Sequence, residues 1–134
     1  MNPRLRRRAR ECAVQFLFGL DMTEYVSSDA LEGFWEMNPT RPGAKDYADA
    51  LIQGVADHLA ELDEAIAGAL ENWTPDRVGG VERNVLRVAL FEMRHMDDVP
   101  DAVAINEAVE IAKRFGADDA PRFVNGVLDR LKGG

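Results

Sequence analysis

The chain has 134 residues, of which 46% are hydrophobic and 30% charged, and its formal net charge is −8. This composition is too apolar for a disordered chain, and no apolar run approaches the roughly 20 residues that cross a bilayer. The single cysteine, Cys12, excludes an intrachain disulfide and is typical of a reducing compartment. We therefore expect one globular domain over residues 1–134, located in the cytoplasm and without membrane contact.

Hydrophobic periodicity predicts an all-α fold, because apolar residues recur at spacings of three and four and no segment alternates as a strand would. About seven helices are expected, over residues 2–20, 28–35, 47–59, 62–70, 81–93, 100–116 and 121–131. Asn2 and Pro3 form a typical helix start, and Ser28 or Asp29 is expected to cap the second helix. Gly116 is well placed to end the sixth. The pattern favours a compact helical bundle.

Positive charge is concentrated at the start of the chain. Five of the 16 basic residues lie within the first ten positions, and all 24 acidic residues follow them. These five are Arg4, Arg6, Arg7, Arg8 and Arg10. Cations at a helix N-terminus oppose the helix dipole by roughly 0.3–1 kcal/mol each, which indicates a functional reason for them. A guanidinium forms bidentate contacts with phosphate, so we expect an RNA-binding surface. A merely solvated helix end stays open as the alternative.

The first helix also predicts a second surface. When its residues are placed at 100° steps, Phe18 falls opposite the apolar face, with Val14 close beside it. An aromatic side chain on a charged face indicates a contact with a protein partner. The alternative, that another helix of the same fold covers Phe18, stays open.

No set of residues indicates catalysis, a cofactor or a metal. His58 and His95 stand alone in the sequence, without Cys, Asp or Glu at a recognised metal-ligand spacing, and are interpreted as surface or structural histidines. Cys12 lies on the core face of its helix and is interpreted as packing. The sequence therefore predicts a protein that is not an enzyme.

Four segments resemble the NusB family of bacterial transcription antitermination factors. They are Arg6–Gln15, Val81–Glu92, Val99–Lys113 and Arg122–Asp129, whereas residues 22–75 match mainly in helical pattern. The resemblance implies two small helical bundles packed together. It also implies binding of single-stranded boxA RNA in ribosomal RNA leaders, as a heterodimer with NusE, a small-subunit ribosomal protein. Such a pair helps RNA polymerase to read through terminators in ribosomal operons.

Combined with the helix projection, the resemblance gives two sets of candidate residues. The RNA-binding set is Arg4, Arg6, Arg7, Arg8, Arg10, Gln15, Phe123 and Asn125. The set for the NusE interface is Val14, Phe18 and Glu82. Arg4 is an addition to the family's arginine-rich motif, and Phe18 replaces a frequent tyrosine. Gln15 and Asn125 are expected to read base edges, and Phe123 to stack on a base.

Two other functions stay open at this point. The chain is also similar to the N-terminal helical part of a ribosomal-RNA cytosine methyltransferase, although 134 residues leave no room for the methyl-donor domain. A homodimer that pairs through Phe18 is the third reading. The acidic pair Asp118 and Asp119, close to the expected RNA segment, is expected to lower RNA affinity by repulsion.

Overall fold

The computed structural model describes residues 2–20, 26–70 and 78–133, and these ranges contain seven α-helices and no strand. The helices are α1 (Pro3–Gly19), α2 (Ser28–Met37), α3 (Pro42–Asp57), α4 (Leu59–Ala69), α5 (Gly80–His95), α6 (Asp101–Phe115) and α7 (Ala120–Leu131). The all-α prediction is confirmed. Two boundaries differ from expectation, since Ser27 rather than Ser28 or Asp29 caps α2, and α3 begins five residues early, with Pro42 in its first turn.

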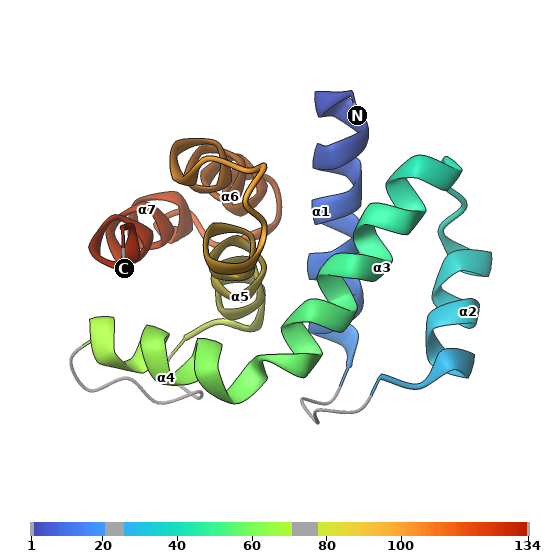
Figure 1. Cartoon of the computed structure of the whole chain (residues 1–134), viewed down its shortest axis with the longest axis horizontal. Helices are drawn as coiled ribbons and strands as arrows, with labels where there is room; N and C mark the ends of the chain where they lie inside the picture. The colour runs from blue at the N-terminus through green and yellow to red at the C-terminus, as the bar shows by residue number, and fades with distance from the viewer. Residues whose placement is uncertain (1, 21–25, 71–77, 134) are drawn as a thin grey trace.

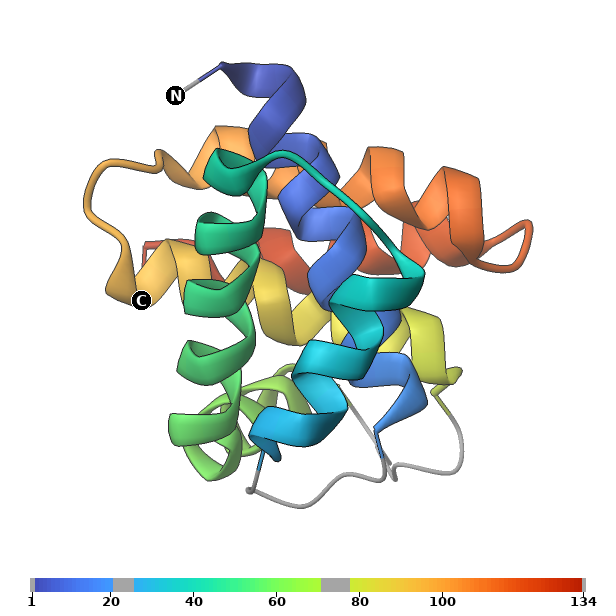
Figure 2. The ribbon, with the colours of Figure 1, turned by 90° about the vertical axis from the view of Figure 1, so that its right-hand side faces the viewer.

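The helices form two groups that meet along α1 and α5 (Figures 1 and 2). In one group α3 packs against α1, and α2 lies on the side of this pair that faces away from α5. In the other group α5, α6 and α7 pack together above α4 (Figure 1). Contacts of α5 with both α1 and α3 join the two groups. This arrangement confirms the expected pair of small packed bundles.

One continuous hydrophobic core fixes α1 between its neighbours. Leu17 of α1, Leu51 of α3, and Leu86 and Leu90 of α5 are among its fully buried side chains. Burying a leucine side chain contributes about 1.5–3 kcal/mol, so this core holds α1 from Ala9 to Leu17 in a defined orientation. The surface residues of α1 are therefore presented from a rigid support.

The chain bends at His58, which ends α3 and precedes α4. Just before it, Gly54 allows α3 to approach α5 closely. A Cβ at Gly54 would lie 2.1 Å from Cζ of Phe91, so no larger residue fits without movement of that ring. Within the described residues, no helix is both long enough and apolar enough to cross a membrane.

Candidate nucleic-acid interface

The first turn of α1 projects past the neighbouring helices (Figure 2). Asn2 caps it, with Oδ1 accepting a hydrogen bond of 2.8 Å from the backbone N–H of Arg4, and Pro3 follows in the first turn. Arg4 is exposed and Arg8 is half-buried. Among the described residues, neither has a carboxylate within ion-pair distance. Both guanidinium groups can therefore bind a phosphate without first breaking an ion pair with a carboxylate.

Two further arginines, the half-buried Arg6 and the exposed Arg7, are already paired. Arg6 Nη2 donates to Asp98 Oδ2 at 2.7 Å, and Arg7 donates to both carboxylate oxygens of Glu107 at 2.9 and 2.6 Å. The hydrogen bonds from these arginines hold the pKa of Asp98 and of Glu107 below their usual values. A phosphate that binds Arg6 or Arg7 must compete with a carboxylate held in place by the fold.

Arg10 is buried and not exposed beside the other arginines, which corrects its expected place among the RNA-binding residues. Its side chain is 4% exposed, and Nε and Nη2 donate three hydrogen bonds to Glu92. The hydroxyl of Tyr47 donates to the same carboxylate at 2.5 Å, and burial together with this bond raises the pKa of Tyr47. For Arg10, burial acts to lower the pKa, but the bond and charge of Glu92 outweigh it. Arg10 therefore stabilises the fold.

The other RNA candidates are not gathered around these arginines. Gln15 is exposed beside a groove of about 410 Å³ between α1 and α2. Asn125 is exposed on α7, where its Nδ2 lies 3.4 Å from Asp129 Oδ2. Phe123 is half-buried and lines a pocket of about 240 Å³ that Glu82 also lines. Since α5 and α6 lie between α7 and α1 (Figure 1), the structure does not bring Asn125 to the arginine-rich turn, by which we mean the start of α1 from Arg4 to Arg8.

The other end of α1 carries the second predicted surface. Phe18 is 58% exposed, and its ring lies over the start of α5, where a Cβ on Gly80 would be 2.9 Å from the ring. Glu82, one half-turn further along α5, accepts a hydrogen bond of 3.1 Å from the backbone N–H of Ala117. Gly80 and Glu82 lie about 200° apart around α5, so the exposed ring and the fixed carboxylate lie at the start of the same helix but on different sides of it.

Val14 does not belong to that surface, which corrects its expected position. It is only 2% exposed, because α5 and α6 cover its side of α1, where it packs with Val85, Val88 and Ala108. The helix projection placed Val14 beside Phe18, but the projection contains no information about which neighbouring helices cover each side of α1.

The structure also corrects the view of His58 and His95 as isolated. Together with Glu61 they converge at the bend between α3 and α4 and the end of α5. The spacing of His58 and Glu61, three residues apart on adjoining helical turns, was the only sequence signal for this cluster. His95 reaches it through tertiary packing alone.

Known protein families and relatives agree on the family of this chain. The model of the NusB family matches residues 7–132. The chain belongs to the NusB family. The transcription antitermination protein NusB of Salinispora arenicola is 44% identical over 94% of this chain and 93% of its own length. That of Bacillus velezensis is 45% identical over 95% of both chains.

Solved structures extend this likeness to three dimensions. A crystal structure of the antitermination factors NusB and NusE in complex with double-stranded RNA contains a chain with a TM-score of 0.84 to this one. The two are 28% identical, and the alignment covers 97% of each. The recognition of the NusB family from four sequence segments is therefore confirmed.

Asp118 and Asp119 are exposed at the turn between α6 and α7, and their effect on RNA affinity stays a prediction.

Proposed function

We propose that this chain is a transcription antitermination factor that binds boxA RNA of ribosomal RNA leaders together with NusE. The observation that carries the proposal is the separation of two surfaces on α1. Arg4 and Phe18 are 14 residues apart, which corresponds to about 21 Å along the helix axis. One rigid helix can therefore hold RNA at its start and a protein at its end simultaneously.

On the RNA side, Arg4 and Arg8 supply the unpaired charges, and Arg7 and Arg6 join them by exchanging carboxylates for phosphates. Phosphate contacts fix the position of the RNA without reading its sequence. The side-chain amide of Gln15 is assigned to base selection. Asn125 and Phe123 would contact bases only in an RNA long enough to pass around α6 to α7. Arg10 acts from the core by holding α1 in place.

On the protein side, Phe18 is the anchor for NusE, with Gly80 beneath its ring and Glu82 as the neighbouring carboxylate. Aromatic anchors in the centre of an interface contribute most of its binding energy. The proposed role is to recruit, as one domain over residues 1–134, and not to catalyse. RNA polymerase is reached indirectly through NusE, and the site of action is the cytoplasm, where the nascent RNA is made.

The test is fluorescence anisotropy of a labelled boxA RNA titrated with the protein alone and with equimolar NusE. A scrambled strand and a boxA duplex serve as RNA controls. We expect tighter binding of the boxA strand than of either control, and a further gain with NusE. Arg4 and Arg8 each neutralise a phosphate without giving up a carboxylate, so the logarithm of affinity should fall with the logarithm of salt at a slope of roughly −1.4, against roughly −3 if Arg6 and Arg7 contributed fully.

Two substitutions separate the surfaces. Arg8→Ala should weaken RNA binding with or without NusE, whereas Phe18→Ala should remove only the gain from NusE. If all three RNAs bind equally and NusE changes nothing, the arginine-rich turn is a solvated helix end and the proposal fails. Light scattering of the protein alone shows whether a homodimer competes for Phe18.

A further inference from the structure

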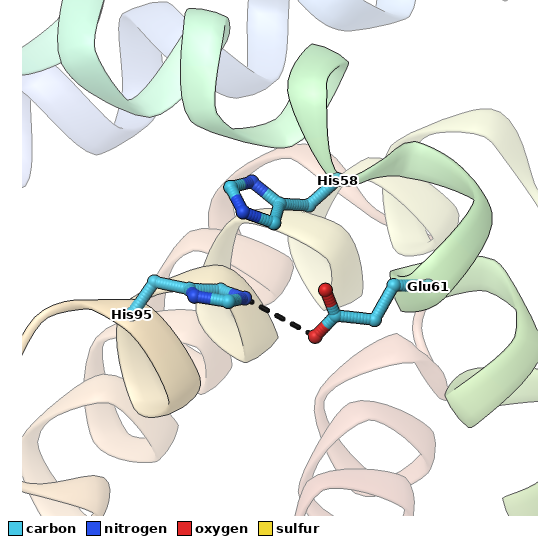
Figure 3. A group of neighbouring side chains, drawn as sticks. All are labelled: His58, Glu61 and His95. Atoms are coloured by element: carbon cyan, nitrogen blue, oxygen red, sulfur yellow. Dashed lines mark hydrogen bonds and ion pairs between the residues drawn. The ribbon is translucent and has the colours of Figure 1, made fainter.

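We propose that His58, Glu61 and His95 form a binding site for a transition-metal dication such as Zn²⁺. The three side chains come from the bend between α3 and α4, from α4 and from the last residue of α5 (Figure 3). One ligand atom from each lies within 4.8 Å of the other two. His95 Nε2 is 3.1 Å from Glu61 Oε1, and the two imidazole rings have centroids 4.0 Å apart.

The fold orients the first ligand before any ion arrives. His58 Nδ1 lies 2.9 Å from the carbonyl oxygen of Gly54. Because a carbonyl only accepts, Nδ1 carries the proton and Nε2 keeps its lone pair in the neutral ring. A metal-binding histidine typically donates its second N–H in this way, which fixes the ring and makes the ligand more basic.

The same packing brings the second histidine into range. Gly54 lets α3 approach Phe91 of α5, and the Phe91 ring stacks against His95 with centroids 5.4 Å apart. The His58 ring also contacts Phe91, at 5.7 Å. Both imidazoles are thus supported by one aromatic ring, on two helices that close packing holds together.

The chemistry of the ligands selects the ion. Two imidazole nitrogens and one carboxylate oxygen suit Zn²⁺, Co²⁺, Ni²⁺ or Cu²⁺, whereas Mg²⁺ and Ca²⁺ prefer oxygen ligands alone. Tetrahedral Zn²⁺ places its ligand atoms about 3.3 Å apart, so small side-chain rotations close the site. The side chains of Glu61 and His95 are 44% and 30% exposed, which leaves water as the remaining ligand.

Two neighbouring charges modify this site. Arg94 Nη1 lies 3.9 Å from Glu61 Oε1, and Asp101 lines the same surface pocket as Glu61 and His95. The positive charge of Arg94 repels a metal ion bound at Glu61, whereas the negative charge of Asp101 attracts it. When the ion binds, it takes the place of the proton between His95 Nε2 and Glu61, and in the neutral ring that proton moves to Nδ1 through solvent.

The test uses the full chain, freed of metal with a chelator and titrated with Zn²⁺ by calorimetry. We expect one ion per chain. Co²⁺ should give the visible absorption of a nitrogen-coordinated ion. The chain has only two histidines, so both imidazole signals in the NMR spectrum should shift together as the ion is added.

Variants assign the ligands. His95→Gln and Glu61→Gln should each weaken Zn²⁺ binding by at least about tenfold. The matched control is Glu64→Gln, which removes an exposed carboxylate from the same helix and should leave the Kd unchanged. Arg94→Gln should tighten binding. Both ligand positions lie on the surface, and the melting temperature of each variant in chelator verifies its fold.

The proposal is overturned if no stoichiometric binding occurs, or if binding survives His95→Gln and Glu61→Gln unchanged. If Arg94→Gln raises the Kd for Zn²⁺ or leaves it unchanged, the ion does not lie beside Glu61. The site does not depend on the proposed function, because none of its residues belongs to the RNA or NusE surfaces.

Discussion

Arg10 donates three hydrogen bonds of 2.8–3.0 Å to the carboxylate of Glu92, and neither side chain is more than 4% exposed. The pair joins α1 of the first group of helices to α5 of the second. One arginine of the basic run thereby holds the two groups together, while Arg4 and Arg7 of the same run are exposed.

Replacing Arg10 by alanine should lower the free energy of unfolding by about 3–5 kcal/mol, because Glu92 would be left buried without its counter-charge. Arg8→Ala is the matched control, with an expected change within about 0.5 kcal/mol. Urea denaturation at pH 7 measures both. Equal stability of the two variants would contradict the structural role of Arg10.

Glu107→Gln should lower stability at pH 7 by about 1–2 kcal/mol through loss of its charged hydrogen bonds to Arg7. Hydrogen bonds from Arg7 hold the pKa of Glu107 below its usual value of 4.5. The contribution of the ion pair is therefore complete above about pH 4.5 and is lost as the pH falls through the lower folded value. The stability gap between the native protein and the variant should close in that acidic range. A gap that stays constant down to pH 2 would contradict this sign.

Asp98→Asn should tighten boxA binding by about two- to fivefold, because Arg6 would no longer exchange a carboxylate for a phosphate. The matched control is Asp97→Asn, which adds the same charge beside it without an ion pair to break. Anisotropy titrations at fixed salt compare the two. If both variants gain equally, the effect comes from net charge and not from Arg6.

Phe18→Ala should raise the Kd for NusE by about 30-fold, as expected for an aromatic anchor of about 2 kcal/mol. Met37→Ala is the control, since Met37 is 82% exposed but lies on α2, away from the proposed interface. Gly80→Ala tests the same surface without removing the ring, because its methyl group would displace Phe18. Calorimetry with purified NusE measures all three, and an unchanged Kd for Phe18→Ala would remove this anchor.

Gly54→Ala should destabilise the protein by at least about 1–3 kcal/mol, because its methyl group would overlap the Phe91 ring. Gly33→Ala, in the middle of α2 with open space around it, should instead stabilise by up to about 1 kcal/mol. Thermal and urea unfolding measure this opposite response. A stable Gly54→Ala variant would show that α3 and α5 can move apart.

The sequence was most informative where local patterns decide the structure. Periodicity predicted all seven helices, the Asn2–Pro3 start of α1 and the Gly116 end of α6, because caps and apolar faces are set within a few residues. These features needed no knowledge of distant contacts. The same helix projection placed Phe18 opposite the apolar face but left open whether another helix covers it, and the structure shows it 58% exposed.

The sequence could not indicate partners that are far apart in the chain. Arg10 and Glu92 are 82 positions apart, and Glu61 and His95 are 34 apart, so only packing shows that they meet. A run of arginines looks uniform in sequence, yet the successive 100° turns of α1 send Arg10 into the core and Arg7 to the surface. Val14 was misplaced for the same reason.

The carboxylates that hold Arg6 and Arg7 also act as built-in counterions. If RNA displaces Asp98 or Glu107 in the proposed complex, the phosphate releases one cation and the vacated carboxylate binds another from solution. Such an exchange releases no net salt ion, so it adds nothing to the salt dependence of binding. Under this proposal, the number of arginines that contact RNA would exceed the number that the salt dependence of binding reports.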